Sequence, residues 1–139
     1  MAEAQPELDL RDVARSAGPY PIEAFLFVRD GLSHTVEEVH HDLDPLSDAS
    51  RHVSGQQLCL GLRDYAIERY GMLAPTVLAT WNIRRTDDFG RIVFAMIEHG
   101  MMSKTPQDTL DDFRCVYDFD EAFSRDELLR RIARPVTRS

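Results

Sequence analysis

The 139-residue sequence predicts a mainly helical α+β fold with one C-terminal β-hairpin. In several segments apolar residues recur three or four positions apart, which is typical of helices with one buried face. Residues 113–119 instead alternate between apolar and polar side chains, which is the period of a half-buried strand. The length suits a single domain, residues 1–139, with one hydrophobic core.

The first half of the chain is predicted to be helical. Residues 1–20 read as an N-terminal arm with a short helix at 8–17, and residues 21–73 as a helical half with helices at 22–40 and 55–70. Pro21 suits a first helical turn, because its missing N–H is not needed there. Ser54 and Gln57 have the spacing of a capping box at the start of the helix at 55–70, and Gly71 suits the C-terminal end of that helix. Residues 42–52 are interpreted as a polar linker.

Residues 74–123 predict two helices followed by the hairpin. A short helix begins at Pro75, and residues 82–85 form a turn. Thr86 is the predicted N-cap of the second helix, which ends at Gly100. One face of that helix carries a clean apolar stripe: Phe89, Ile92, Val93, Met96 and Ile97. Strands are expected at 101–105 and 113–119, and residues 124–139 are expected to form a basic C-terminal helix and tail.

This helix–turn–helix–hairpin order resembles a known DNA-associated architecture. Residues 81–86, Phe89 and residues 97–102 are similar to the middle of bacterial winged helix-turn-helix proteins, in which a short turn leads into the recognition helix and an apolar pair after glycine leads into the wing. The resemblance implies that residues 74–123 are winged-helix-like. That fold usually binds DNA, although it also serves in protein docking.

A second resemblance covers residues 20–123. It rests on five phrases of the sequence: Tyr20–Phe25, Arg51–Gln56, Asp88–Phe94, Met102–Thr105 and Val116–Phe123. These phrases resemble a family of small uncharacterised proteins found mainly in planctomycetes and verrucomicrobia. The resemblance implies a bacterial source. It implies no activity and no site residues.

The charge of the chain is strongly acidic and uneven. The formal net charge is −8, although residues 125–139 carry five arginines against Asp126 and Glu127. An acidic body repels nucleic acid and anionic lipid, and it suits a basic partner. A solvated acidic surface without any partner would have the same composition.

The positions that would face DNA in a winged helix are also acidic. Asp87 and Asp88 open the predicted recognition helix, and Asp108, Asp111 and Asp112 lie at the predicted wing tip. Carboxylates facing phosphates add repulsion instead of counterion release. We therefore expect a protein partner rather than nucleic acid, and a basic partner would complement this charge. The predicted partner-binding residues are Asp87, Asp88, Arg91, Phe94, Asp108, Asp111 and Asp112.

Two alternatives to a protein-interaction module stay open. The first is a DNA-binding transcriptional regulator that relies on Arg84, Arg85, Lys104 and the arginine-rich tail. The second is a small-molecule-binding protein or an enzyme around His52 and Ser54. Ser54 lacks the flanking glycines of a nucleophile elbow, and capping explains it more simply.

No cofactor, metal or catalytic residue is predicted. The sequence has neither a phosphate-binding loop nor a dinucleotide fingerprint. Ligand-type side chains gather between residues 40 and 52, but their spacing matches no closed zinc pattern. They are His40, His41, Asp42, Asp44 and His52.

The sequence predicts a cytoplasmic location and no association with membranes. No apolar run approaches the roughly 18–20 residues that span a bilayer, and the polar N-terminus is unlike a signal peptide. Cys59 and Cys115 both fall on apolar patterns, which predicts two buried free thiols in a reducing compartment. The prediction is therefore a non-enzymatic protein–protein interaction module, and its oligomeric state is not predicted.

Overall fold

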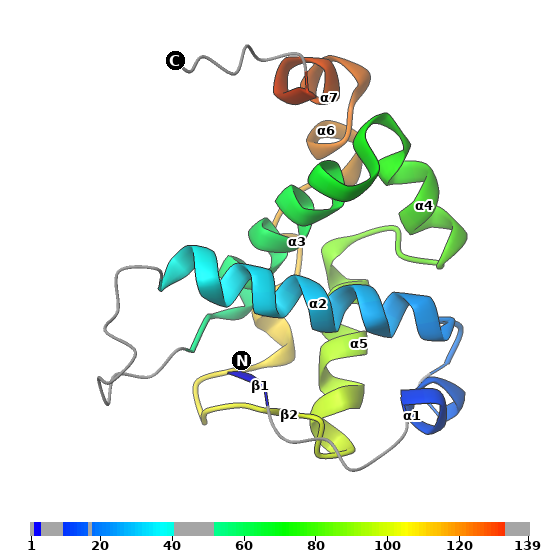
Figure 1. Ribbon diagram of the computed structural model, residues 1–139. Helices are drawn as coiled ribbons and strands as arrows, with labels where there is room; N and C mark the ends of the chain where they lie inside the picture. Colours follow the sequence, from blue (N-terminus) through cyan, green and yellow to red (C-terminus); the bar gives the residue numbers. More distant parts are fainter. Residues whose placement is uncertain (1, 4–9, 17, 41–51, 133–139) are drawn as a thin grey trace.

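The computed structural model describes residues 2–3, 10–16, 18–40 and 52–132, and Figure 1 shows that this part of the chain is mainly helical. Three helices make up its first half: α1 (Leu10–Ser16), α2 (Ile22–Val39) and α3 (Gly55–Tyr70). The predicted helices are confirmed over these ranges. The remaining predicted residues of the short first helix, 8, 9 and 17, lie outside the described residues.

Helix α3 begins at the predicted capping box. The Gln57 backbone N–H donates to Ser54 Oγ at 3.1 Å, and the Ser54 N–H donates to Gln57 Oε1 at 2.9 Å. The helix ends at Gly71, whose φ of 55° favours glycine. Helices α2 and α3 pack closely, because a Cβ at Gly31 would overlap the Leu62 side chain.

The second half begins with the 3-10 helix η1 (Gly71–Leu73), followed by α4 (Ala74–Thr80) and α5 (Thr86–Glu98). Helix α5 packs against both α2 and α3. Thr86 is its first helical residue and not its N-cap, a position that Arg85 occupies. The predicted apolar stripe of α5 is confirmed. The largest fully buried side chains of the core come from α2, α3, α4 and α5, from the loop before α5, and from two segments after it. They are Phe25, Leu32, Leu58, Leu62, Leu78, Ile83, Phe89, Ile92, Met96, Phe113 and Leu128.

The predicted C-terminal β-hairpin is wrong, and so is the winged-helix-like assignment of residues 74–123. The two strands in the described part of the chain are β1 (Ala2–Glu3) and β2 (Met102–Ser103), which pair antiparallel with Ala2 opposite Ser103. The strand after α5 therefore pairs with the start of the chain (Figure 1). The expected second strand is replaced by the 3-10 helix η2 (Leu110–Phe113), an irregular segment and the short helix α6 (Phe119–Ala122).

Side chains at the start of α5 explain why residues 113–116 do not form a strand. The Thr86 hydroxyl donates to the Phe113 carbonyl at 2.7 Å and accepts the Val116 N–H at 3.1 Å. Asp87 accepts the Cys115 N–H at 3.4 Å, and Cys115 has a φ of 50°. The backbone groups that a hairpin partner would use are therefore bonded to α5.

Helix α7 (Arg125–Ile132) closes the described part of the chain and contacts η1. Ser124 caps its start, because Ser124 Oγ accepts the Glu127 N–H at 3.1 Å. Arg131 then bonds to Glu127 at 2.8 Å and to Asp64 of α3 at 2.9 Å. Two of the five tail arginines, 134 and 138, lie outside the described residues. Among the described residues, no helix has the length and apolar character needed to cross a bilayer.

Candidate functional site

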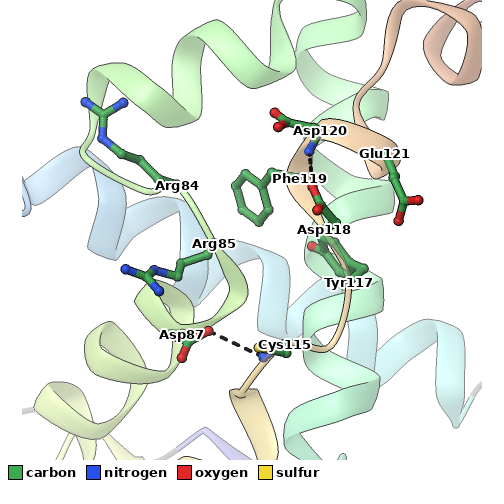
Figure 2. Close-up of a pocket in the computed structure, with 9 residues that line it drawn as sticks. All are labelled: Arg84, Arg85, Asp87, Cys115, Tyr117, Asp118, Phe119, Asp120 and Glu121. Carbon is green, nitrogen blue, oxygen red and sulfur yellow. Dashed lines mark hydrogen bonds between the residues drawn. The ribbon is translucent and has the colours of Figure 1, made fainter.

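A hollow of about 520 Å³ opens where the start of α5 faces the segment leading into α6 (Figure 2). Two loops and the first turns of two helices form its walls. The lining residues are Arg84, Arg85, Asp87, Cys115, Tyr117, Asp118, Phe119, Asp120 and Glu121. Side chains more than 25 positions apart in the sequence therefore share one surface.

The arginine wall is held by the loop between α4 and α5. Asn82, at a φ of 64°, donates from its side-chain amide to the Pro19 carbonyl at 2.7 Å. The backbone N–H groups of Arg84 and Arg85 donate to the Asp88 carboxylate at 2.8 and 3.2 Å. The loop backbone is fixed by these bonds, while both guanidinium groups stay exposed.

The opposite wall combines aromatic rings with carboxylates. The rings of Tyr117 and Phe119 stack with centroids 5.7 Å apart, and Figure 2 shows Phe119 lying between the arginine and acidic sides of the hollow. The Tyr117 hydroxyl donates to the Cys59 carbonyl at 2.9 Å, and burial raises the pKa of that phenol well above its usual range. Asp118 caps α6 by accepting the Asp120 N–H at 2.7 Å.

Charge is the dominant chemical property of this hollow. The lining carries two guanidinium groups and four carboxylates, those of Asp87, Asp118, Asp120 and Glu121. None of these six side chains forms an ion pair with another residue of the described part of the chain. The hollow therefore carries net negative charge that is available to an incoming group.

Of the predicted partner-binding residues, Asp87 lines the hollow, whereas Asp88 supports the fold. Asp88 is only 6% exposed and accepts hydrogen bonds from the Tyr20 hydroxyl at 2.5 Å and from Arg91 at 2.8 Å. Burial raises the pKa of the Tyr20 phenol, and the bond to Asp88 raises it further. Arg91 is thus engaged with Asp88 at the surface.

The acids of the expected wing tip are dispersed. Asp108 is 5% exposed, accepts the Thr105 N–H at 2.9 Å and pairs with His52 at 3.0 Å. Burial opposes ionisation of Asp108, yet these two contacts help to hold its pKa below the usual value. Asp111 is exposed beside Arg114, with 3.8 Å between charged atoms. The expectation that Asp108 is a surface charge is wrong, because it closes a turn.

Three further predicted residues also lie outside the hollow. Asp112 accepts the Thr109 N–H at 3.0 Å, so it stabilises the start of η2. Phe94 is half-buried and packs edge-on against Phe113, with ring centroids 6.2 Å apart. Lys104 is exposed next to β2. Of the three residues in the nucleic-acid alternative, only Arg84 and Arg85 line the hollow.

The candidate metal and enzyme residues have structural roles where they are described. His52 pairs with Asp108, its backbone carbonyl lies 2.5 Å from His40 Nε2, and Ser54 caps α3. Residues 41, 42 and 44 of the expected ligand cluster lie outside the described residues. Within the described ranges no three such side chains are grouped as metal ligands. Both cysteines are free, and Cys59 is buried as predicted, but Cys115 is exposed and lines the hollow.

Sequence reasoning missed the acidic wall formed by Asp118, Asp120 and Glu121. It treated these residues as the end of a strand and the loop after it. A signal was present, because Asp118 and Glu121 have the spacing of a helix N-cap and its third helical residue. That pattern favours a helix start at residue 119, where α6 begins.

Comparison with known proteins gives no match to a protein-family model, to a curated protein or to a solved structure. The resemblance to the small bacterial protein family stays a prediction, and the function has to be inferred from the chemistry of the hollow.

Proposed function

We propose that the protein is a non-enzymatic protein–protein interaction module whose charged hollow binds a basic segment of a partner. The observation that carries this proposal is the unpaired charge of the hollow, four carboxylates against two guanidinium groups around Phe119. Lysine or arginine side chains of a partner would meet the acidic wall. A carboxylate of the same segment would meet Arg84 and Arg85. Such complementarity favours specificity and fast association.

The lining favours a protein partner over a small molecule or a nucleic acid. Pockets for small molecules are mostly apolar with a few polar groups, whereas six of the nine lining residues here are charged. A phosphate approaching Arg84 and Arg85 would also face the carboxylates of Asp87 and Asp120, which lowers the gain from counterion release. Arg131 is already engaged by Glu127 and Asp64.

The environments of the candidate catalytic groups also support a binding role. Ser54 is engaged as a helix cap, and the His52 ring is engaged in a contact with the Asp108 carboxylate. As part of the same proposal we place the module in the cytosol. Free thiols such as Cys59 and the exposed Cys115 persist in that reducing compartment.

Affinity capture from a native, nuclease-treated lysate tests this proposal with three baits: wild type, Asp120→Lys/Glu121→Lys and the control Asp126→Lys/Glu98→Lys. The control reverses two exposed acids outside the hollow, and Asp126 lies in the first turn of a helix as Asp120 does. We expect one protein to be retained by wild type and control. The hollow variant should bind it about tenfold or more weakly at an unchanged melting temperature.

Two results would contradict the proposal. A partner held equally by all three baits would place its binding surface elsewhere. A partner that is captured from untreated lysate and lost after nuclease treatment would favour the DNA-binding alternative.

A further inference from the structure

A second pocket, of about 250 Å³, lies between α2 and the C-terminal end of α3 and shares no lining residue with the charged hollow. Four of its eight lining residues are aromatic, and two are acidic. The lining residues are Glu23, Leu26, Phe27, Asp30, Tyr65, Arg69, Tyr70 and Trp81. Its volume is below the roughly 300 Å³ at which drug-sized ligand pockets begin. The pocket therefore suits a side-chain head group.

Four aromatic residues are packed together in this pocket. Phe27 is 4% exposed, and its ring centroid lies 5.4 Å from that of Tyr65 and 5.5 Å from that of Trp81. Tyr70 lies edge-on to Trp81 with centroids 6.0 Å apart. Tyr65, Tyr70 and Trp81 are half-buried, so each also has an exposed part. The faces of such rings carry negative potential and attract organic cations.

The chain itself shows that these rings accept a guanidinium group. The central guanidinium carbon of Arg69 lies 5.7 Å from the Tyr65 ring centroid and 5.8 Å from that of Tyr70. Arg69 Nη1 also donates to the Tyr65 hydroxyl at 3.4 Å. Within the described part of the chain Arg69 forms no ion pair with a carboxylate. The aromatic faces, and not an acid, hold this cation.

Carboxylates stand on the other wall. Glu23, Phe27 and Asp30 follow each other at four and three positions along α2, which places them on one face of the helix. Asp30 bonds to its neighbour Arg29 at 3.2 Å, and both side chains are about half exposed. Glu23 forms no ion pair with another described residue. Helix α2 therefore presents an acid, a ring and a second acid toward the pocket.

We propose that this pocket binds the guanidinium group of an arginine side chain supplied by a partner protein. The planar, weakly hydrated cation would stack on the exposed ring faces, and its N–H edge would donate to Glu23 and Asp30. Arg69 is an exposed side chain on the last turn of α3 and moves aside when the incoming group binds. This site is additional to the charged hollow and does not depend on the role proposed for it.

Trp81 gives a direct test, because it is the only tryptophan of the chain and lines this pocket. Its indole N–H gives one NMR signal, which is followed during titration with N-acetyl-arginine amide. The matched probe is N-acetyl-citrulline amide, which has nearly the same shape and no charge. We expect a chemical-shift change that saturates with the arginine probe. The citrulline probe should bind at least about fivefold more weakly, a factor that corresponds to the upper range of an exposed cation–π contact.

Three variants locate the binding site within the pocket. The double variant Glu23→Gln/Asp30→Asn should bind the arginine probe about three- to tenfold more weakly, as expected for the loss of two exposed charge contacts. Arg69→Gln should bind the arginine probe more tightly, because a competing cation is removed. Asp126→Asn, an exposed acid on α7, should leave it unchanged. The proposal is overturned by a shift that does not saturate, by equal binding of the citrulline probe, or by weaker binding to Arg69→Gln.

Discussion

Thr86→Val should destabilise the protein markedly, although it hardly changes the shape of the side chain. Thr86 is fully buried, and its hydroxyl bonds to the Phe113 carbonyl at 2.7 Å and to the Val116 N–H at 3.1 Å. Valine removes both bonds and creates no cavity. Each unsatisfied backbone group costs about 1–3 kcal/mol, with the half-buried Val116 amide at the low end. Together the two groups cost about 2–4 kcal/mol, and the added methyl group offsets about 0.8 kcal/mol, so the net loss is about 1–3 kcal/mol.

Urea unfolding followed by Trp81 fluorescence measures this loss. With a slope of about 2 kcal/mol per molar urea, the midpoint should fall by about 0.5–1.5 M. Thr86→Ser is the matched control, because it keeps the hydroxyl and loses one methyl group, worth about 0.8 kcal/mol. Hydrogen exchange at the Val116 amide should become faster in the valine variant and stay slow in the serine variant.

Two outcomes would refute this reasoning. In the first, the valine variant unfolds within about 0.25 M urea of wild type. In the second, the serine variant loses as much stability as the valine variant. Either result would mean that the Thr86 hydroxyl does not hold the segment after η2 in place.

Two further predictions concern pH and thiol reactivity. Folding lowers the pKa of Asp108 from its ordinary 3.8, so the contacts of its carboxylate with Thr105 and His52 stabilise the protein above that pH. This stabilisation is lost as the pH falls through 3.8 toward the folded-state pKa. Urea midpoints should therefore fall more for wild type than for Asp108→Asn between about pH 5 and about pH 3, and parallel curves would contradict the assignment. In the folded protein only the exposed Cys115 should react with a chromogenic disulfide reagent and release one equivalent of chromophore. Cys59 should release a second equivalent only on unfolding, because burial raises the pKa of its thiol and excludes the reagent. Rapid reaction of two thiols in the folded protein, or of one thiol in the folded Cys115→Ser variant, would show that Cys59 is accessible.

The candidate site was predictable only in part. Arg84, Arg85 and Asp87 stand next to a helix start that the sequence reveals, so their exposure could be expected. The acidic wall at residues 118–121 lies more than 30 positions away from them in the chain, and only the packing of the segment after η2 on α5 brings the two sets together. Asp88 and Asp108 looked like surface charges because the side chains that help to bury them, Tyr20 and His52, lie 68 and 56 positions away in the chain.

The sequence by itself determined the longer helices α2, α3 and α5, because their signals are local. A capping box at Ser54, a stop at Gly71 and the apolar stripe of α5 each involve neighbours within a few positions. The tertiary structure alone decided residues 113–119, whose alternation also fits a strand. Hydrogen bonds from Thr86 and Asp87 satisfy that backbone from outside the segment, and β2 takes its partner from the start of the chain. Every buried backbone donor and acceptor needs a partner, but sequence period does not say which element supplies it.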